Sequence, residues 1–301
     1  MKLIEALKWV MALKDVEYKK NTKASYNSFI RSMAEYLVKK GKSDYLLKEF
    51  DKQEAILYLD YLLIEKKVSA ITRNNHLKSF LALFNILKER GHIGKNCFHG
   101  IKKIKEAKKR RQVYSRAEAQ LICNYLKNKD EGLLLAVSLC YYCALRATEI
   151  RDLRIRDINL EKGLITIDGT ETKNKDLAGV TMSKHFVKFC KKINLDKYPP
   201  HYYAVGFKLL PSAQQCGTSA IRRRHLLILR ELEKYKLLKD VQNKTFYSWK
   251  DTGARDMLED GIDAAALMRH FRHKNLSTTQ RYIESFGVRN DRIRDFKGKL
   301  I

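Results

Sequence analysis

The sequence predicts a mainly α-helical protein with a small antiparallel sheet in its second half. Three observations predict this fold class. The 301 residues include only 3 prolines and 14 glycines, long segments repeat their apolar residues with the period of an amphipathic helix, and one pair of segments is rich in β-branched residues. A chain of this length with 45% hydrophobic residues can bury a core in each of two domains.

Helices are expected throughout the first third of the chain. They lie at residues 22–40, 51–66 and 69–90. The second begins with Asp51 and Glu54, which have the spacing of a capping box, whereas Gly41 and Gly91 end the first and the third. We therefore predict a helical N-terminal domain over residues 1–101.

A strongly basic linker is expected next. The segment IKKIKEAKKRRQ, residues 101–112, has seven basic residues and no apolar face wide enough to bury. We place the linker at residues 102–112, as a solvated tether between two domains. Such a tether can also lie along phosphates, so Lys109 and Arg110 are candidate contacts to nucleic acid.

The second domain is predicted over residues 113–301. Ser115 and Glu118 form another capping box at its first helix. Residues 163–168, GLITID, alternate as a strand does, and residues 178–182 are the expected partner across a turn. Further helices are expected at residues 183–193, 218–235, 247–260, 263–272 and 277–284.

The net charge of the chain limits the kinds of partner that it can bind. The formal net charge is +27, from 61 Lys and Arg against 34 Asp and Glu, so a polyanion is the expected partner. Nucleic acid and an anionic membrane both qualify, but the longest apolar run, residues 133–145, is too short to span a bilayer. No signal peptide is expected. We therefore expect a cytoplasmic protein.

The cysteines give no sign of a disulfide framework or a metal site. Six are present, and the one CxxC, Cys140 to Cys143, has no second pair to complete a tetrahedral site. Buried thiols are expected, and no metal.

Arg146 is the first candidate for chemistry. In CALRATEIRDL it follows an apolar helix, and a buried guanidinium without a partner is costly. Glu149, three residues later, is the nearest partner for an intramolecular ion pair. The alternative is a fork of donors held for a phosphate.

Two further candidates are basic. In the expected hairpin turn, ETKNKD, Lys173 is either a solvated surface residue or a proton donor to a leaving oxygen, and Lys175 competes for that role. Tyr247 and Lys250 lie three apart at a helix start, on one side of the helix. The helix dipole and the unpaired N–H groups favour a phosphate there.

The last candidate stretch is HFRHKNLSTTQRYI, which contains His273 and Tyr282. A turn and a short helix separate them, so both can face one pocket. The structural alternative is a core residue, because a lone tyrosine on an amphipathic helix is normally buried with its hydroxyl at the rim.

The order of these residues resembles that of the tyrosine recombinase (phage integrase) family. ALRATEIRDLRIRDINL is similar to the first arginine box of that family, GLITIDGTETKNKD to its lysine hairpin, and MLEDGIDAAALMRHFRHKNLSTTQRYI to its terminal box. The helical N-terminal unit is similar to the core-binding, SAM-like domain of the family. The resemblance implies a mainly α fold in which this domain and an α+β catalytic domain form a C-shaped clamp on DNA.

The resemblance also implies the roles of the site residues. Arg146 and His273 would bind and polarise the scissile phosphate. Lys173 would protonate the leaving 5′ oxygen, and Tyr282 would attack phosphorus to give a 3′-phosphotyrosine. A phenol with a pKa of about 10 needs nearby cations to ease its deprotonation, and these cations also stabilise the transition state. Another strand's 5′-hydroxyl can reverse the attack, so no metal or other cofactor is expected.

Two departures from the family pattern are present. Tyr247 and Lys250 stand where the family usually has His-x-x-Arg, which replaces a bidentate fork by a point charge and a histidine by a poorer proton acceptor. We interpret this as a modified site. Phe271 and Arg272 precede His273, where the family tends to have a small apolar residue and glycine. Arg272 is expected either to add a phosphate contact or to be solvent-exposed.

The partner implied by the resemblance is double-stranded DNA with paired recombination half-sites. A homotetramer is expected on DNA and a monomer or dimer when free, with room for an accessory DNA-bending protein. The tail, residues 285–301, has apolar residues at roughly helical spacing and is expected to dock on a neighbouring protomer. The candidate DNA contacts, for which a hydrated surface is the alternative, are Arg73, Asn74, Asn75, His76, Lys78, Arg222, Arg223 and Arg224.

Two rival functions remain open at this point. One is a sequence-specific DNA-binding protein that has the recombinase fold and impaired catalysis, for which Lys250 is the best support. The other is a type IB topoisomerase-like relaxing enzyme, which shares the phosphotyrosine chemistry and lacks site preference. The small size and the separate helical N-terminal unit favour a recombinase.

Overall fold

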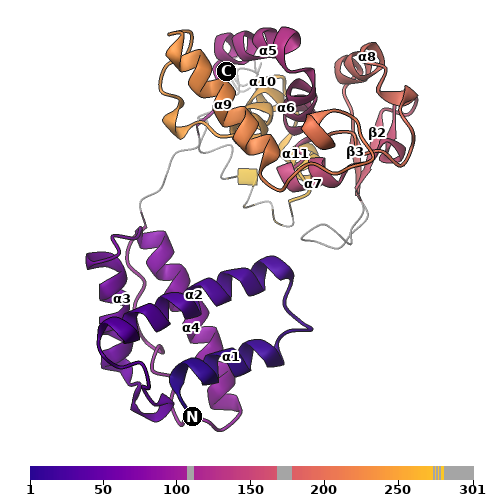
Figure 1. Ribbon diagram of the computed structural model, residues 1–301. Helices are drawn as coiled ribbons and strands as arrows, with labels where there is room; N and C mark the ends of the chain where they lie inside the picture. The colour runs from indigo at the N-terminus through magenta and orange to yellow at the C-terminus, as the bar shows by residue number, and fades with distance from the viewer. Residues whose placement is uncertain (107–111, 168–177, 274, 276, 278, 281–301) are drawn as a thin grey trace, which may run out of the picture. The chain divides into compact units, whose positions relative to one another are not determined.

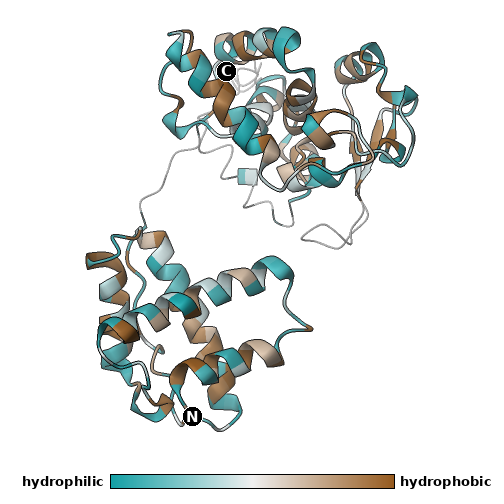
Figure 2. Ribbon diagram, in the orientation of Figure 1, coloured by the Kyte–Doolittle hydropathy of each residue, from teal (hydrophilic) through white to brown (hydrophobic). Residues whose placement is uncertain are grey.

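The chain divides into two compact units, Met1–Lys109 and Arg110–Ile301. The computed structural model (Figure 1) describes residues 1–106, 112–167, 178–273, 275, 277, 279 and 280. Each unit has a hydrophobic core of its own, and Figure 2 shows hydrophobic residues on helix faces within both. None of the helices in the described ranges is long and apolar enough to cross a membrane.

Residues 1–106 contain four α-helices. They are α1 (Leu3–Leu13), α2 (Lys20–Lys39), α3 (Lys52–Ile64) and α4 (Ala70–Glu89), with a 3₁₀ turn, η1 (Leu47–Glu49). The three predicted helices are confirmed to within two residues at each end. Asp51 caps α3 by accepting a hydrogen bond from the backbone N–H of Glu54 at 2.9 Å. α1 was not predicted, because its N-cap, Lys2, is not a capping residue type.

Two polar residues of α4 hold the segment that follows the bundle. Arg73 and Asn74 are 5% and 4% exposed. Arg73 Nη1 donates to the Lys102 carbonyl at 2.9 Å. Asn74 Nδ2 donates to the Ile104 carbonyl at 2.9 Å, and Asn74 Oδ1 accepts from the Ile104 N–H at 3.1 Å. Both side chains are therefore used to fix residues 102–104 to α4.

His76 is buried on the same helix. Its Nδ1 lies 2.8 Å from the Tyr58 hydroxyl, and burial lowers its pKa to about 4. The polar atoms of Arg73, Asn74 and His76 are engaged within their own domain, which gives no support to the predicted DNA contacts at these residues. Asn75 and Lys78 are exposed and remain candidates.

The described part of the second unit contains seven α-helices and a small sheet. The helices are α5 (Arg116–Lys129), α6 (Glu131–Cys143), α7 (Ala147–Asp152), α8 (Lys184–Lys192), α9 (Ala220–Lys234), α10 (Ser248–Glu259) and α11 (Ala264–His270). Short 3₁₀ turns are η2 (Ile155–Asp157), η3 (Leu195–Lys197), η4 (Phe207–Leu209) and η5 (Val241–Asn243). The capping box predicted at the start of α5 is confirmed, because Ser115 and Glu118 exchange hydrogen bonds.

α6 is the central helix of this unit (Figure 1). Every residue from Gly132 to Cys140 is buried, and α5, α9 and α10 all pack against it. α10 comes very close, since a Cβ added at Gly253 would collide with the backbone carbonyl of Tyr141. All six cysteines are free thiols, and all except Cys123 are buried, in accord with the expectation.

The sheet has three antiparallel strands in the order β1-β2-β3. They are β1 (Ile158–Asn159), β2 (Leu164–Ile167) and β3 (Ala178–Thr181). The predicted pairing of the last two is confirmed, with Leu164 opposite Thr181 and Ile167 opposite Ala178. β1 was missed because two residues are too few to show an alternating pattern. The turn between β2 and β3, with Lys173 and Lys175, lies outside the described residues.

Candidate active site

The turn from α6 to α7 positions Arg146. Ala144, at the C-terminal end of α6, has a left-handed φ of 52°. Arg146 is the N-cap of α7; its backbone N–H donates to Glu149 Oε2 at 2.8 Å and its Nη1 to Glu149 Oε1 at 2.6 Å. The side chain of Glu149 is 6% exposed and that of Arg146 is 35% exposed. The ion pair expected from the sequence is present, and it leaves the guanidinium partly accessible.

A second arginine shares the same carboxylate. Arg272 Nη2 donates to Glu149 Oε2 at 2.7 Å and to the Ala144 carbonyl at 3.4 Å. The Arg272 side chain is only 10% exposed, so the solvent-exposed alternative is wrong. Burial lowers the pKa of this guanidinium, and the Glu149 charge opposes that shift. A guanidinium nevertheless stays protonated at neutral pH.

Lys250, predicted to add to a phosphate site at the start of α10, is fully buried. Its Nζ donates to the Ala144 carbonyl at 2.7 Å and lies 4.9 Å from the centroid of the Phe271 ring. Burial, followed by the charges of Arg146 and Arg272, lowers the pKa of Lys250 to about 7. Lys250 thus stiffens the turn after α6 from inside the protein.

Tyr247 differs from Lys250 in its exposure. It is the N-cap of α10 and is 40% exposed, with its ring centroid 5.9 Å from Lys250 Nζ. The two residues therefore lie on one side of the helix, as expected. Trp249, between them, is buried and stacks on Tyr114 at 4.4 Å, while its Nε1 donates to His225 at 3.0 Å.

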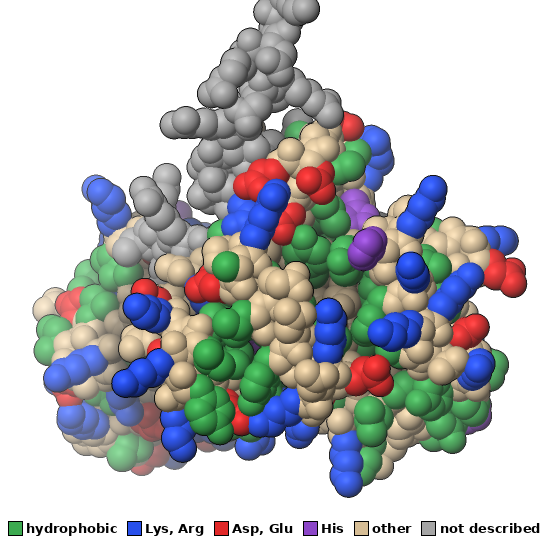
Figure 3. Space-filling view, turned by 90° about the horizontal axis from the view of Figure 1, so that it is seen from above, with side chains coloured by type: hydrophobic (Ala, Val, Ile, Leu, Met, Phe, Trp, Pro, Cys, Tyr) green, Lys and Arg blue, Asp and Glu red, His purple; other side chains and the backbone are tan. Residues whose placement is uncertain are grey.

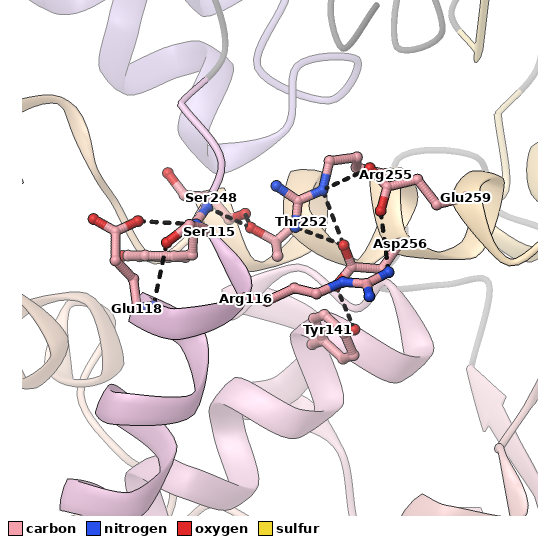
Figure 4. Close-up of polar contacts among 10 residues, drawn as sticks. Ser115, Arg116, Glu118, Tyr141, Ser248, Thr252, Arg255, Asp256 and Glu259 are labelled. Carbon is pink, nitrogen blue, oxygen red and sulfur yellow. Dashed lines mark hydrogen bonds and ion pairs between the residues drawn. The ribbon is translucent and has the colours of Figure 1, made fainter. Parts of the chain in front are cut away.

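Polar contacts along α10 fix this helix against α5 and α6 (Figure 4). The Tyr141 hydroxyl donates to Asp256 Oδ2 at 2.6 Å, and Arg255 forms an ion pair with Asp256 at 2.6 Å. Arg116 of α5 reaches Glu259 at 3.3 Å. Because α10 is tied to both neighbours, its buried lysine has a fixed position relative to the end of α6.

His273 is joined to the same region through Phe271. The two rings lie edge to face with centroids 5.7 Å apart, and Phe271 is also the ring beneath Lys250. His273 Nδ1 lies 2.9 Å from Thr279 Oγ1. The predicted residues that fall outside the described part of the chain are Lys109, Arg110, Lys173, Lys175, Tyr282 and the tail, residues 285–301.

The assembled cluster has an excess of positive charge. Arg146, Lys250 and Arg272 come from three different segments, and the one carboxylate that both arginines share is Glu149. Basic groups held close together in a poorly solvated place repel one another and favour an anion among them. Planar guanidinium groups bind phosphate oxygens in bidentate fashion. The site is therefore suited to a phosphate group.

Basic side chains outside the cluster are spread over the surface. Arg222, Arg223 and Arg224 are exposed on α9, although Arg224 Nε also donates to Asp130 Oδ2 at 2.6 Å. Lys and Arg side chains are scattered over the face drawn in Figure 3 and are not gathered into one patch. A broad positive field of this kind suits a long polyanion.

A family match places the chain in the tyrosine recombinase class of DNA strand-exchange enzymes. The chain belongs to the phage integrase family: residues 112–287 match the Phage integrase family, and residues 3–92 match the Phage integrase N-terminal SAM-like domain. It is a site-specific recombinase.

Known proteins of this class are similar over most of the chain. A tyrosine recombinase of Pseudothermotoga lettingae is 23% identical over 261 residues, which are 85% of this chain and 85% of that protein. The Tn1549 transposon integrase, in complex with a circular intermediate DNA, has a TM-score of 0.77 at 15% identity and covers 94% of this chain and 95% of its own. A lambda integrase tetramer bound to a Holliday junction has a TM-score of 0.72 at 18% identity, with 100% and 80% covered.

Proposed function

We propose that this recombinase cuts and rejoins DNA through a phosphotyrosine at Tyr282. The Tyr282 phenol gives up its proton to solvent and its oxygen forms a bond to phosphorus. The bond from phosphorus to the 5′ oxygen breaks, and Lys173 gives that oxygen its proton. Arg146 and His273 bind and polarise the phosphate in this scheme. The observation that carries the proposal is the pairing of Arg146 and Arg272 on the buried Glu149, with Lys250 next to them.

The electrostatics of the cluster suit this reaction. Attack on a phosphodiester places more negative charge on the phosphate oxygens, so fixed cations lower the barrier when they face those oxygens. The same cations favour the phenolate form of an attacking tyrosine, whose ordinary pKa is about 10. Rejoining runs the same steps in reverse, with a 5′-hydroxyl as the nucleophile.

The proposed partner is double-stranded DNA with paired half-sites, bound by both domains as a clamp. Support comes from the net charge of +27 and from the exposed basic residues of both units. A homotetramer on DNA is proposed by analogy with the lambda integrase assembly, with the tail, residues 285–301, docked on a neighbouring protomer. The protein acts in the cytoplasm on nucleoid or mobile-element DNA.

A nicked duplex tests the proposed reaction. Sequencing of the DNA that flanks the gene identifies the junction, and a duplex with that junction is nicked close to the cleavage point so that the short 5′-hydroxyl fragment leaves. The intact protein should form a covalent protein–DNA adduct that Tyr282→Phe does not form. Tyr235→Phe, a change at an exposed tyrosine of the same unit, should leave the adduct unchanged.

Other outcomes favour the rival functions. Tight binding of the junction without an adduct would indicate a DNA-binding protein. Relaxation of supercoiled plasmids that lack the junction would indicate a relaxing enzyme.

A further inference from the structure

Arg272 occupies a backbone conformation that arginine rarely adopts. Its φ is 54°, in the left-handed region where a Cβ crowds the following carbonyl and glycine is favoured. Other left-handed basic residues, such as Lys67 and Lys236, are exposed, where a side chain has freedom to adjust. Arg272 is held in this conformation with its side chain 10% exposed. A strained residue in a buried charge cluster indicates a function for its side chain.

The strained backbone aims the Arg272 guanidinium at Glu149. That carboxylate receives Arg146 Nη1 on Oε1 at 2.6 Å and Arg272 Nη2 on Oε2 at 2.7 Å. The two guanidinium groups are therefore held on the two oxygens of one carboxylate. A guanidinium presents five N–H donors in a plane, so a single group can hold a carboxylate and a phosphate together.

Lys250 lies behind these two arginines. It is fully buried, and its Nζ donates to the Ala144 carbonyl at 2.7 Å, which Arg272 Nη2 also approaches at 3.4 Å. Lys250 supports the turn, but it has neither the exposure nor the planar fork to clamp a phosphate.

We propose that Arg272 supplies the second guanidinium of the phosphate site, so that Arg146 and Arg272 together bind the two non-bridging oxygens of the scissile phosphate. Glu149 spaces the two groups before DNA binds, and Lys250 stabilises the turn beneath them. This proposal rests on the proposed function, since it assigns a further residue to the same reaction. The competing explanation is a latch, in which the ion pair between Arg272 and Glu149 only joins the end of α11 to α7.

The test compares two substitutions that make the same change to the backbone. Arg272→Gly removes the guanidinium at a position whose left-handed backbone glycine adopts without strain. Lys236→Gly does the same at an exposed left-handed lysine after α9, with φ of 58°. Arg272→Lys keeps the charge and removes the fork. Adduct formation by the full-length variants is measured on the nicked junction duplex with an ordinary phosphodiester and with an uncharged methylphosphonate at the scissile position.

On the phosphodiester, Arg272→Gly should slow adduct formation about 100-fold or more, as the loss of one fixed donor does in other active sites, and Lys236→Gly should have little effect. Arg272→Lys should recover only part of the rate. On the methylphosphonate, the deficit of Arg272→Gly should shrink below tenfold, because there is less charge left to neutralise. A near-normal rate for Arg272→Gly, or an equal deficit on both substrates, overturns the proposal and favours the latch.

Binding of inorganic phosphate separates this proposal from the proposed function. Phosphate should raise the melting temperature of the unmodified protein and of Lys236→Gly more than that of Arg272→Gly. If the unmodified protein forms no adduct and the phosphate effect still depends on Arg272, the proposed reaction fails while the second phosphate ligand stands. If phosphate stabilises all three proteins equally, Arg272 is not a phosphate ligand.

Discussion

The described part of each unit buries an arginine, and the surroundings of Arg73 and Arg272 differ. Arg73 in the first unit donates to a backbone carbonyl at Lys102, next to the amide network of Asn74. Arg272 in the second unit shares one carboxylate with Arg146 and adopts a left-handed backbone. The first arrangement fastens a chain segment, whereas the second gathers positive charge around a single Glu149. A buried basic residue whose neighbours are also cations indicates a site for an anionic ligand.

Loss of Glu149 should have the largest effect on stability. Glu149→Gln keeps the shape of the side chain and leaves Arg146 and Arg272 without their shared countercharge, which should lower the free energy of unfolding by about 3–5 kcal/mol. Urea unfolding at neutral pH measures the change. Glu161→Gln, in a surface turn, is the matched control. A loss below about 1 kcal/mol would mean that the two arginines do not depend on this carboxylate.

Loss of Arg146 should act on the reaction. Arg146→Ala should slow adduct formation on the nicked duplex by about 10²–10³-fold, since a fixed donor to the phosphate is removed. Arg73→Met is the matched change in the other unit, and it should alter the rate for folded protein less than threefold. If the two variants were equally slow, the distinction between the two buried arginines would fail.

The hydrogen bonds of Asn74 in the first unit should contribute to stability and not to the reaction. Asn74→Ala removes both hydrogen bonds to Ile104 and should cost about 1–3 kcal/mol of unfolding free energy, measured by urea. Asn75→Ala, at the exposed neighbouring position, should change it by less than about 0.5 kcal/mol. Similar values for the two variants would show that the anchored segment adds nothing to the stability of this unit.

Lys250 should make stability depend on pH. Its pKa is 10.5 without burial and about 7 in the folded protein, so below pH 7 both states hold the proton and the buried charge destabilises the fold fully. Between pH 7 and 10.5 the folded state has lost the proton, and the free energy of unfolding should rise by up to about 1.4 kcal/mol per pH unit. Lys250→Met should remove this rise. Urea unfolding of both proteins across pH 6.5–9.5 measures it, and parallel pH profiles would contradict the low pKa.

The smallest effect is expected at the exposed surface of α4. Lys78→Ala should weaken DNA binding slightly and lower the slope of log affinity against log salt by about one, because one phosphate contact is lost. Lys66→Ala is the control substitution, because Lys66 is paired with Glu35 at 3.0 Å. An unchanged slope for Lys78→Ala would remove Lys78 from the DNA surface.

Local signals in the sequence determined most of the fold. Apolar periodicity, together with capping residues such as Asp51 and Ser115, located the helices, and alternation located β2 and β3. These signals act over a few residues, so they can be read without knowing which segments meet. The Arg146–Glu149 pair was predictable for the same reason, since three residues along a helix separate the partners.

Only the tertiary structure decided which basic residues come together at the candidate site. Lys250 meets Ala144 across 106 positions and Arg272 meets Glu149 across 123, whereas Arg73 meets Lys102 inside the other unit. The sequence shows a basic residue in each case and gives no sign of the partner that each one contacts in the fold. The burial of a side chain and the charges around it depend on residues that packing brings together from distant parts of the chain. Local sequence patterns do not identify those residues.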